Sequence, residues 1–198
     1  MAPVSAGMTT RLHLICAAAT ASTAAVAFAA DEPLDPRGRD SLARLAGRLP
    51  SCEVVLRSPA RCAAETAEGL ALDAKPEPAL RDCDFGRWAG RSLAEVQAQA
   101  PEAVAEWLQN PRAAPHGGES FMDVMTRARA WMEGLLAVDG AVLAVTHALV
   151  IRAAIAHALG AGPEAFGRID VAPLTRTRLS GVGGRWTLAA LVPLKDDR

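Results

Sequence analysis

The sequence lacks several features that would place it in a specialised class of protein. None of its 198 residues is tyrosine, aromatic residues make up 4%, and the formal net charge is -1. A chain with so little excess charge of either sign carries no signature of nucleic-acid binding or of attachment to an acidic membrane surface. Hydrophobic residues account for 51% and charged residues for 22%, which is typical of a globular domain with a sizeable core.

Paired cysteines are also missing. The four cysteines, Cys16, Cys52, Cys62 and Cys83, form no Cys-x-x-Cys motif and no cluster with histidine. This pattern argues against a zinc site and against a disulfide framework, and it is typical of a protein in a reducing cytosol. The sequence therefore implies no metal and no other cofactor.

The N-terminal region resembles a secretory signal, because an uncharged stretch runs from Leu12 to Ala30 and ends in small residues. This stretch is too rich in Ala, Thr and Ser for a convincing membrane span. The competing interpretation makes residues 11–16 a buried central strand, which cleavage after Ala30 would remove. We favour the strand and a cytoplasmic location. Residues 1–10 are then a leader, with Met8 as an alternative start, and residues 11–198 form a single domain.

Apolar runs alternate with helical periodicities along the chain, which indicates an α/β protein. The expected strands are residues 11–15, 53–56 and 141–145, followed by a terminal hairpin of residues 175–180 and 185–192. Helices are expected to start near Asp35-Pro36, Ser58-Pro59, Ser92, Pro101, Ser120 and Val150. The predicted fold is a three-layer α/β/α sandwich around a mostly parallel central sheet.

Chemically suggestive residues follow three of the expected strands. Cys16 and Ala17 follow the first strand, Arg61 lies just beyond the second, and His147 follows the third. Ligands of open α/β sheets bind beyond the carboxyl ends of the strands, so these residues should meet at one site. Arginine near a helix N-terminus favours a phosphate group.

Several segments together resemble the histidine phosphatase superfamily, which is phosphoglycerate mutase-like. They are Cys16-Ala17-Ala18, Ser58-Pro59-Ala60-Arg61, Leu80-Arg81-Asp82, Gly117-Gly118-Glu119-Ser120 and Val145-Thr146-His147. The resemblance extends from about Arg11 to Leu191 and implies that family's fold. It also implies that the ligand is a phosphorylated small molecule. The oligomeric state, monomer or homodimer, stays open.

The resemblance implies a role for each site residue. His147 matches the family's second catalytic histidine, which hydrogen-bonds the transferred phosphoryl group, and Arg61 matches a phosphate-clamping arginine. Asp82 stands where the family commonly has a glutamate that protonates the leaving group, with Asp84 as a rival for that role. Glu119 is expected at the mouth of the pocket.

The first motif departs from the family at all three positions. The family has Arg-His-Gly where this chain has Cys16, Ala17 and Ala18. Alanine has no lone pair with which to attack phosphorus, so Ala17 closes the phosphohistidine route. Cys16 removes a cationic clamp, and we expect it to be a buried, inert thiol.

We therefore predict an impaired histidine phosphatase, a pseudo-phosphatase that binds phosphomonoesters. One alternative is an active small-molecule phosphomonoesterase, similar to α-ribazole phosphatase, that uses His147, Arg61 and Asp82 without a phosphohistidine. A second alternative is a scaffold that serves an interaction with another protein.

Overall fold

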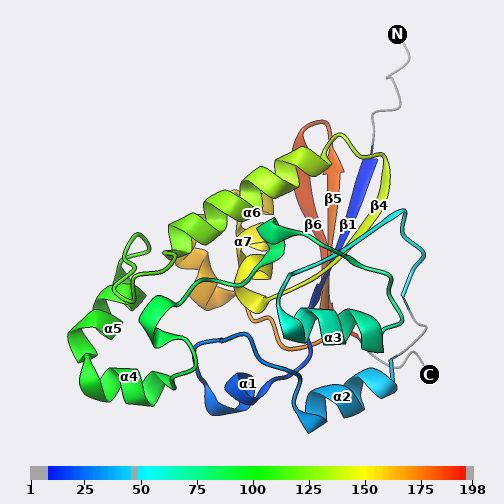
Figure 1. The fold of residues 1–198 in the computed structure, drawn as a ribbon. Helices are drawn as coiled ribbons and strands as arrows, with labels where there is room; N and C mark the ends of the chain where they lie inside the picture. Colours follow the sequence, from blue (N-terminus) through cyan, green and yellow to red (C-terminus); the bar gives the residue numbers. More distant parts are fainter. Residues whose placement is uncertain (1–8, 46–48, 195–198) are drawn as a thin grey trace.

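A six-stranded sheet forms the centre of the computed structural model, which describes residues 9–45 and 49–194. The strand order is β3-β2-β4-β1-β5-β6 (Figure 1). The strands are β1 (Thr9–Cys16), β2 (Val54–Arg57), β3 (Lys75–Pro76), β4 (Gly140–Thr146), β5 (Thr175–Val182) and β6 (Arg185–Pro193). The first four run parallel to one another, whereas β5 and β6 form an antiparallel hairpin at one edge. This confirms the predicted α/β fold with a mostly parallel sheet.

The signal-like segment is a central strand. β1 pairs with β4 on one side and with β5 on the other, and its Leu12, Leu14 and Ile15 are fully buried. The strand begins at Thr9, two residues before the predicted start, so the sheet includes the end of the predicted leader. Residues 1–8 lie outside the described part of the chain.

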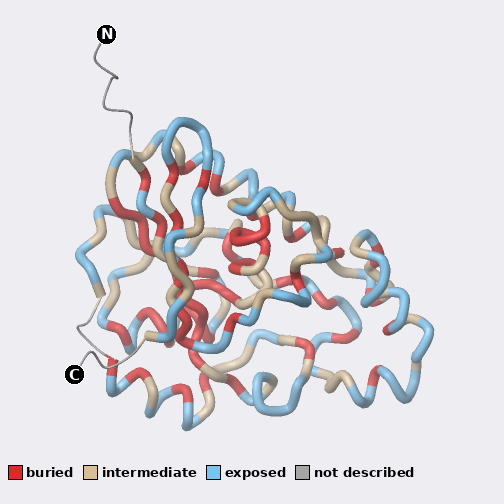
Figure 2. Tube along the Cα trace, turned by 180° about the vertical axis from the view of Figure 1, so that it is seen from behind, coloured by how far each residue is buried: buried red, intermediate tan, exposed pale blue. Residues whose placement is uncertain are grey.

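Helices cover both faces of the sheet. On one face, α6 (Phe121–Leu135) and α7 (Ala148–Ala158) pack against alternate residues of β1 and β4. On the other face, α2 (Pro36–Ala43) and α3 (Arg61–Gly69) pack against the residues between them. Both faces of β4 are therefore apolar, as a buried parallel strand requires. Figure 2 shows the buried residues gathered along these central strands.

The described residues form three further α-helices: α1 (Ala21–Ala25), α4 (Leu93–Gln99) and α5 (Pro101–Gln109). The capping boxes expected at Ser92 and Ser120 are present. Two helix starts were predicted wrongly. Ser58 Oγ accepts the N–H of Ala60, and this turn delays α3 to Arg61. α7 begins at Ala148, two residues earlier than predicted, and His147 is the one residue between it and the end of β4.

His116, in the loop before α6, is buried. Its ring lies 5.1 Å from that of Trp88 and 5.8 Å from that of Phe85, centroid to centroid. Its Nδ1 accepts the N–H of Gly118. Within the described residues, no helix is both long enough and apolar enough to cross a membrane.

Candidate functional site

Backbone hydrogen bonds connect the segments that follow the carboxyl ends of β1 and β2 to the end of β4. The N–H of Ala17 donates to the carbonyl of Thr146 at 2.8 Å, and the N–H of Ser58 donates to that of Val145 at 2.8 Å. The segments after β1, β2 and β4 therefore meet at one edge of the sheet, as predicted from their sequence positions.

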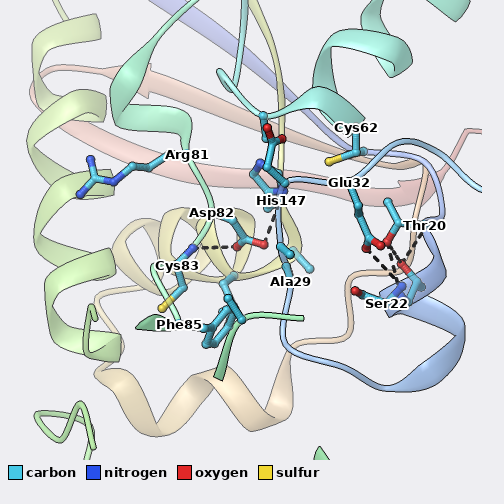
Figure 3. A pocket seen from close by; sticks show the side chains of 18 of the residues that line it. Thr20, Ser22, Ala29, Glu32, Cys62, Arg81, Asp82, Cys83, Phe85 and His147 are labelled. Carbon is cyan, nitrogen blue, oxygen red and sulfur yellow. Dashed lines mark hydrogen bonds and ion pairs between the residues drawn. The ribbon is translucent and has the colours of Figure 1, made fainter. Parts of the chain in front are cut away.

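A cavity of about 690 Å³ opens at this edge (Figure 3). Five of the predicted site residues line it, namely Cys16, Ala17, Asp82, Asp84 and His147. Further lining residues come from α1, from the loop containing Asp31 and Glu32, from the neighbours of Asp82 and Asp84, and from the N-terminal ends of α3 and α7. α7 has no side-chain cap and its first residues line the cavity, whereas the first amide of α3, that of Arg61, donates to Asp31 Oδ1 at 2.7 Å.

His147 lies between two side chains that hold its ring. Its Nε2 is 2.8 Å from Ser58 Oγ, and its Nδ1 is 3.5 Å from Asp82 Oδ2. Ser58 is fully buried and is not among the lining residues, so it stands behind the histidine. Asp82, rather than Asp84, is therefore the carboxylate paired with His147. Asp84 instead accepts the N–H of Gly86.

Arg61 does not line the cavity. Its side chain is 60% exposed and its Nε donates to Glu65 Oε1 at 2.9 Å, one turn further along α3. The next residue, Cys62, faces the cavity instead. Because α3 starts at Arg61, residue 61 points outward and residue 62 inward. The Arg61 guanidinium is thus paired with Glu65 and is not part of the cavity wall, and its role as a phosphate clamp stays a prediction.

Three cysteines line the cavity, namely Cys16, Cys62 and Cys83, and burial raises the pKa of each thiol. Burial, and secondly the nearby charge of Asp82, raises the pKa of Cys16 to about 12. The same two causes raise the pKa of Cys62 to about 12. Both therefore stay protonated near neutral pH and are poor nucleophiles, as expected for Cys16.

Glu119 also lies outside the cavity lining, which corrects its expected position at the mouth. Its carboxylate receives two bonds from Arg127, at 3.1 Å and 2.9 Å, and one from Arg81 at 2.6 Å. Arg127 additionally donates to the carbonyls of Ala79, Arg81 and Asp82. These two residues hold the loop that carries Asp82.

No sequence motif marks Arg127 as a partner of Glu119, because it is one of several polar residues on an amphipathic helix. Backbone conformation and close packing explain the double glycine before Glu119, because Gly117 has a φ of 82° and Gly118 lies against the backbone of Asp84. A Cβ on Gly118 would collide with the carbonyl of Asp84. Among the described residues, no group of three or more His, Cys, Asp or Glu side chains is placed to hold a metal ion.

A comparison with protein families decides the classification. Residues 12–192 match the model of the histidine phosphatase superfamily (branch 1). The chain belongs to the histidine phosphatase superfamily.

Curated relatives include phosphatases. A glucosyl-3-phosphoglycerate phosphatase of Mycolicibacterium vanbaalenii is 32% identical over 146 residues, which is 66% of this chain and 64% of that protein. A protein of Mycobacterium tuberculosis described as bifunctional is 37% identical over 129 residues, 61% of this chain and 35% of its own length. This histidine phosphatase thus aligns with about a third of that longer protein.

Solved structures agree on the fold. A mycobacterial glucosyl-3-phosphoglycerate phosphatase in complex with VO3 matches with a TM-score of 0.79 at 27% identity, covering 92% of this chain and 98% of that one. A protein of Escherichia coli described as an alpha-ribazole-5'-P phosphatase matches with a TM-score of 0.83. At 23% identity, over 96% of this chain and 98% of that one, this second match supports the shared fold alone.

Proposed function

We propose that this histidine phosphatase homologue binds phosphomonoesters without forming a phosphohistidine, so that its hydrolytic activity is strongly impaired. The observation that carries the proposal is that Ala17, which the sequence resemblance aligns with the family's nucleophile, lines the cavity. Among the described lining residues, His147 is the one imidazole, and its Nε2 is turned toward buried Ser58. The described lining residues therefore offer no second imidazole as a phosphoryl acceptor.

Phosphate binding is supported by features that survive the loss of the nucleophile. The first residues of α7, which has no side-chain cap, line the cavity, and free amide groups at a helix N-terminus attract anions. His147 adds a ring nitrogen on the same side. The phosphatase relatives make a phosphorylated small molecule the natural class of ligand.

A direct test uses phenyl phosphate and the purified chain. We expect binding that is detectable by calorimetry and abolished by phosphate or vanadate competition, with almost no release of phenol. Rapid phenol release that is lost in His147→Ala contradicts the proposed impairment. A complete lack of binding contradicts the proposed ligand and favours the scaffold alternative.

One observation favours the active phosphomonoesterase as a second candidate. Asp82 and His147 form an acid-base pair, with 3.5 Å between Oδ2 and Nδ1, that could assist direct attack by water. This route avoids a covalent intermediate. It predicts slow turnover without a burst, and equal loss of turnover in Asp82→Asn and His147→Ala.

We also propose a cytoplasmic location. The signal-like segment forms β1 at the centre of the sheet, and all four cysteines are free thiols. Removing β1 by signal cleavage would destroy the sheet, and free thiols suit a reducing compartment. Cell fractionation tests this, and mature protein starting after Ala30 contradicts it.

A further inference from the structure

The hydrogen bond between Ser58 and His147 restricts where the imidazole carries its proton. Ser58 Oγ already accepts the N–H of Ala60 at 3.2 Å, so its own hydroxyl proton is available to Nε2 of His147, 2.8 Å away. Because Ser58 is fully buried, this proton has no water to turn toward. Nε2 is then an acceptor in the neutral ring, which leaves the ring proton on Nδ1.

Asp82 favours the same arrangement from the other side of the ring. Its Oδ2 lies 3.5 Å from Nδ1, and an ionised carboxylate only accepts hydrogen bonds. A lone pair on Nδ1 would be repelled by this carboxylate, whereas an N–H group is attracted to it. The cavity therefore presents an N–H donor and a carboxylate acceptor side by side.

The charges around the cavity disfavour a doubly charged ligand. Four carboxylates line it: Asp31, Glu32, Asp82 and Asp84. The one Arg or Lys side chain among the described lining residues is Arg81, which pairs with Glu119 at 2.6 Å and points away from His147 (Figure 3). Arg152 does not line the cavity. A phosphate dianion would thus be desolvated with no unpaired cation among the described lining residues to compensate it.

We infer that the site selects the singly protonated monoanion of a phosphomonoester, by pairing an ionised phosphate oxygen with His147 Nδ1–H and the P–OH group with the Asp82 carboxylate. The inference rests on the proposed phosphate binding at this cavity. It specifies the protonation state of the ligand. The protein offers one donor and one acceptor, and the monoanion offers the complementary acceptor and donor. The amide groups at the start of α7 add a partial positive charge suited to one negative charge.

The test measures affinity against pH with three probes of similar size: propyl phosphate, butyl phosphonate and its α,α-difluoro analogue. Their second pKa is highest for the phosphonate and lowest for the fluorinated compound. Affinity should fall about tenfold for each pH unit above the second pKa of each probe. The midpoint should therefore move with the probe, because the ligand is the group that titrates.

Three outcomes separate the claims. A midpoint common to all three probes indicates titration of a protein group, such as His147, and overturns the inference while the proposed function stands. Affinity that rises with pH indicates dianion binding and also overturns the inference alone. No binding of any probe at any pH overturns the proposed function as well.

Two variants test the assigned partners. Asp82→Asn replaces the acceptor with a group that can also donate, and it removes one negative charge, so dianion affinity above the second pKa should rise at least tenfold. Asp73→Asn, an exposed aspartate away from the cavity, is the matched control and should leave the pH profile unchanged. An unchanged profile in Asp82→Asn overturns the assignment. Nitrogen-15 NMR of His147 should show the proton on Nδ1 in the wild type, and a mixture of tautomers in Ser58→Ala.

Discussion

Ser58 Oγ lies 2.8 Å from Nε2 of His147, although the two residues are 89 positions apart in the chain. Each follows the end of a parallel strand, β2 and β4 respectively, and the two strands are hydrogen-bonded neighbours. This contact links His147 to the buried interior. It orients the ring so that Nδ1, rather than Nε2, faces Asp82.

Ser58→Ala should destabilise the fold by about 1–3 kcal/mol, because it leaves Nε2 of His147 and the N–H of Ala60 without their buried partner. Urea denaturation monitored by tryptophan fluorescence measures the change. Ser51→Ala, at an exposed serine, is the control and should alter stability by less than about 0.5 kcal/mol. Equal effects of the two substitutions contradict the structural role of the hydroxyl.

Arg61 and Cys62 should respond in opposite ways in a phenyl phosphate binding assay. Arg61→Ala removes an exposed side chain paired with Glu65, so affinity should change less than about twofold. Cys62→Arg places a guanidinium in the cavity and should raise affinity about tenfold through a charge-assisted hydrogen bond. Loss of binding in Arg61→Ala would show that residue 61 reaches the ligand after all.

Breaking the pair between Arg127 and Glu119 should be costly, because both side chains are largely buried, at 12% and 14% exposure. Arg127→Ala should lower the free energy of unfolding by about 3 kcal/mol and loosen the loop that carries Asp82. The pair of Arg129 with Glu133 lies on the same helix but is exposed. Its variant Arg129→Ala should cost less than about 1 kcal/mol. Comparable losses in both variants contradict this assignment.

His116 should make stability depend on pH. Burial lowers the pKa of His116 below its ordinary value of 6.5, and Nδ1 must stay unprotonated to accept from Gly118. The unfolded chain therefore binds a proton more readily, so stability is full above about pH 6.5 and declines as pH falls below it.

His13 and His157 also have lowered pKa values, so the contribution of His116 is isolated by difference. In His116→Asn, whose side-chain oxygen can replace Nδ1 as acceptor, the loss of stability between pH 7 and pH 5 should be smaller. Denaturation of both proteins across this range checks the prediction. A loss as steep in the variant as in the wild type contradicts it.

The fold was predictable because its signals are local and repeated. Apolar runs marked the central strands, and Ser92 and Ser120 marked helix starts through their capping boxes. The meeting of Ala17 and His147 followed from the rule that parallel strands end at one edge. These inferences need only the order of elements and the period of the apolar residues.

Side-chain direction was less predictable. Arg61 and Cys62 are neighbours in sequence, and a shift of two residues in the start of α3 decides which of them faces the cavity. Glu119 was expected at the pocket mouth. Its pairing with Arg127 was not foreseen, because Arg127 lies eight residues further along the chain and carries no motif of its own. Long-range ion pairs of this kind leave no trace in local patterns.

The central claim is that Ala17 leaves this histidine phosphatase without a covalent phosphoryl acceptor, and the most direct measurement is phosphoenzyme trapping. Wild-type protein and the variant Cys16→Arg/Ala17→His/Ala18→Gly are mixed with ³²P-labelled phenyl phosphate, quenched rapidly and analysed for protein-bound label. We predict no label on the wild type and an acid-labile phosphohistidine on the variant. Stoichiometric, acid-labile label on the wild-type chain would contradict the account.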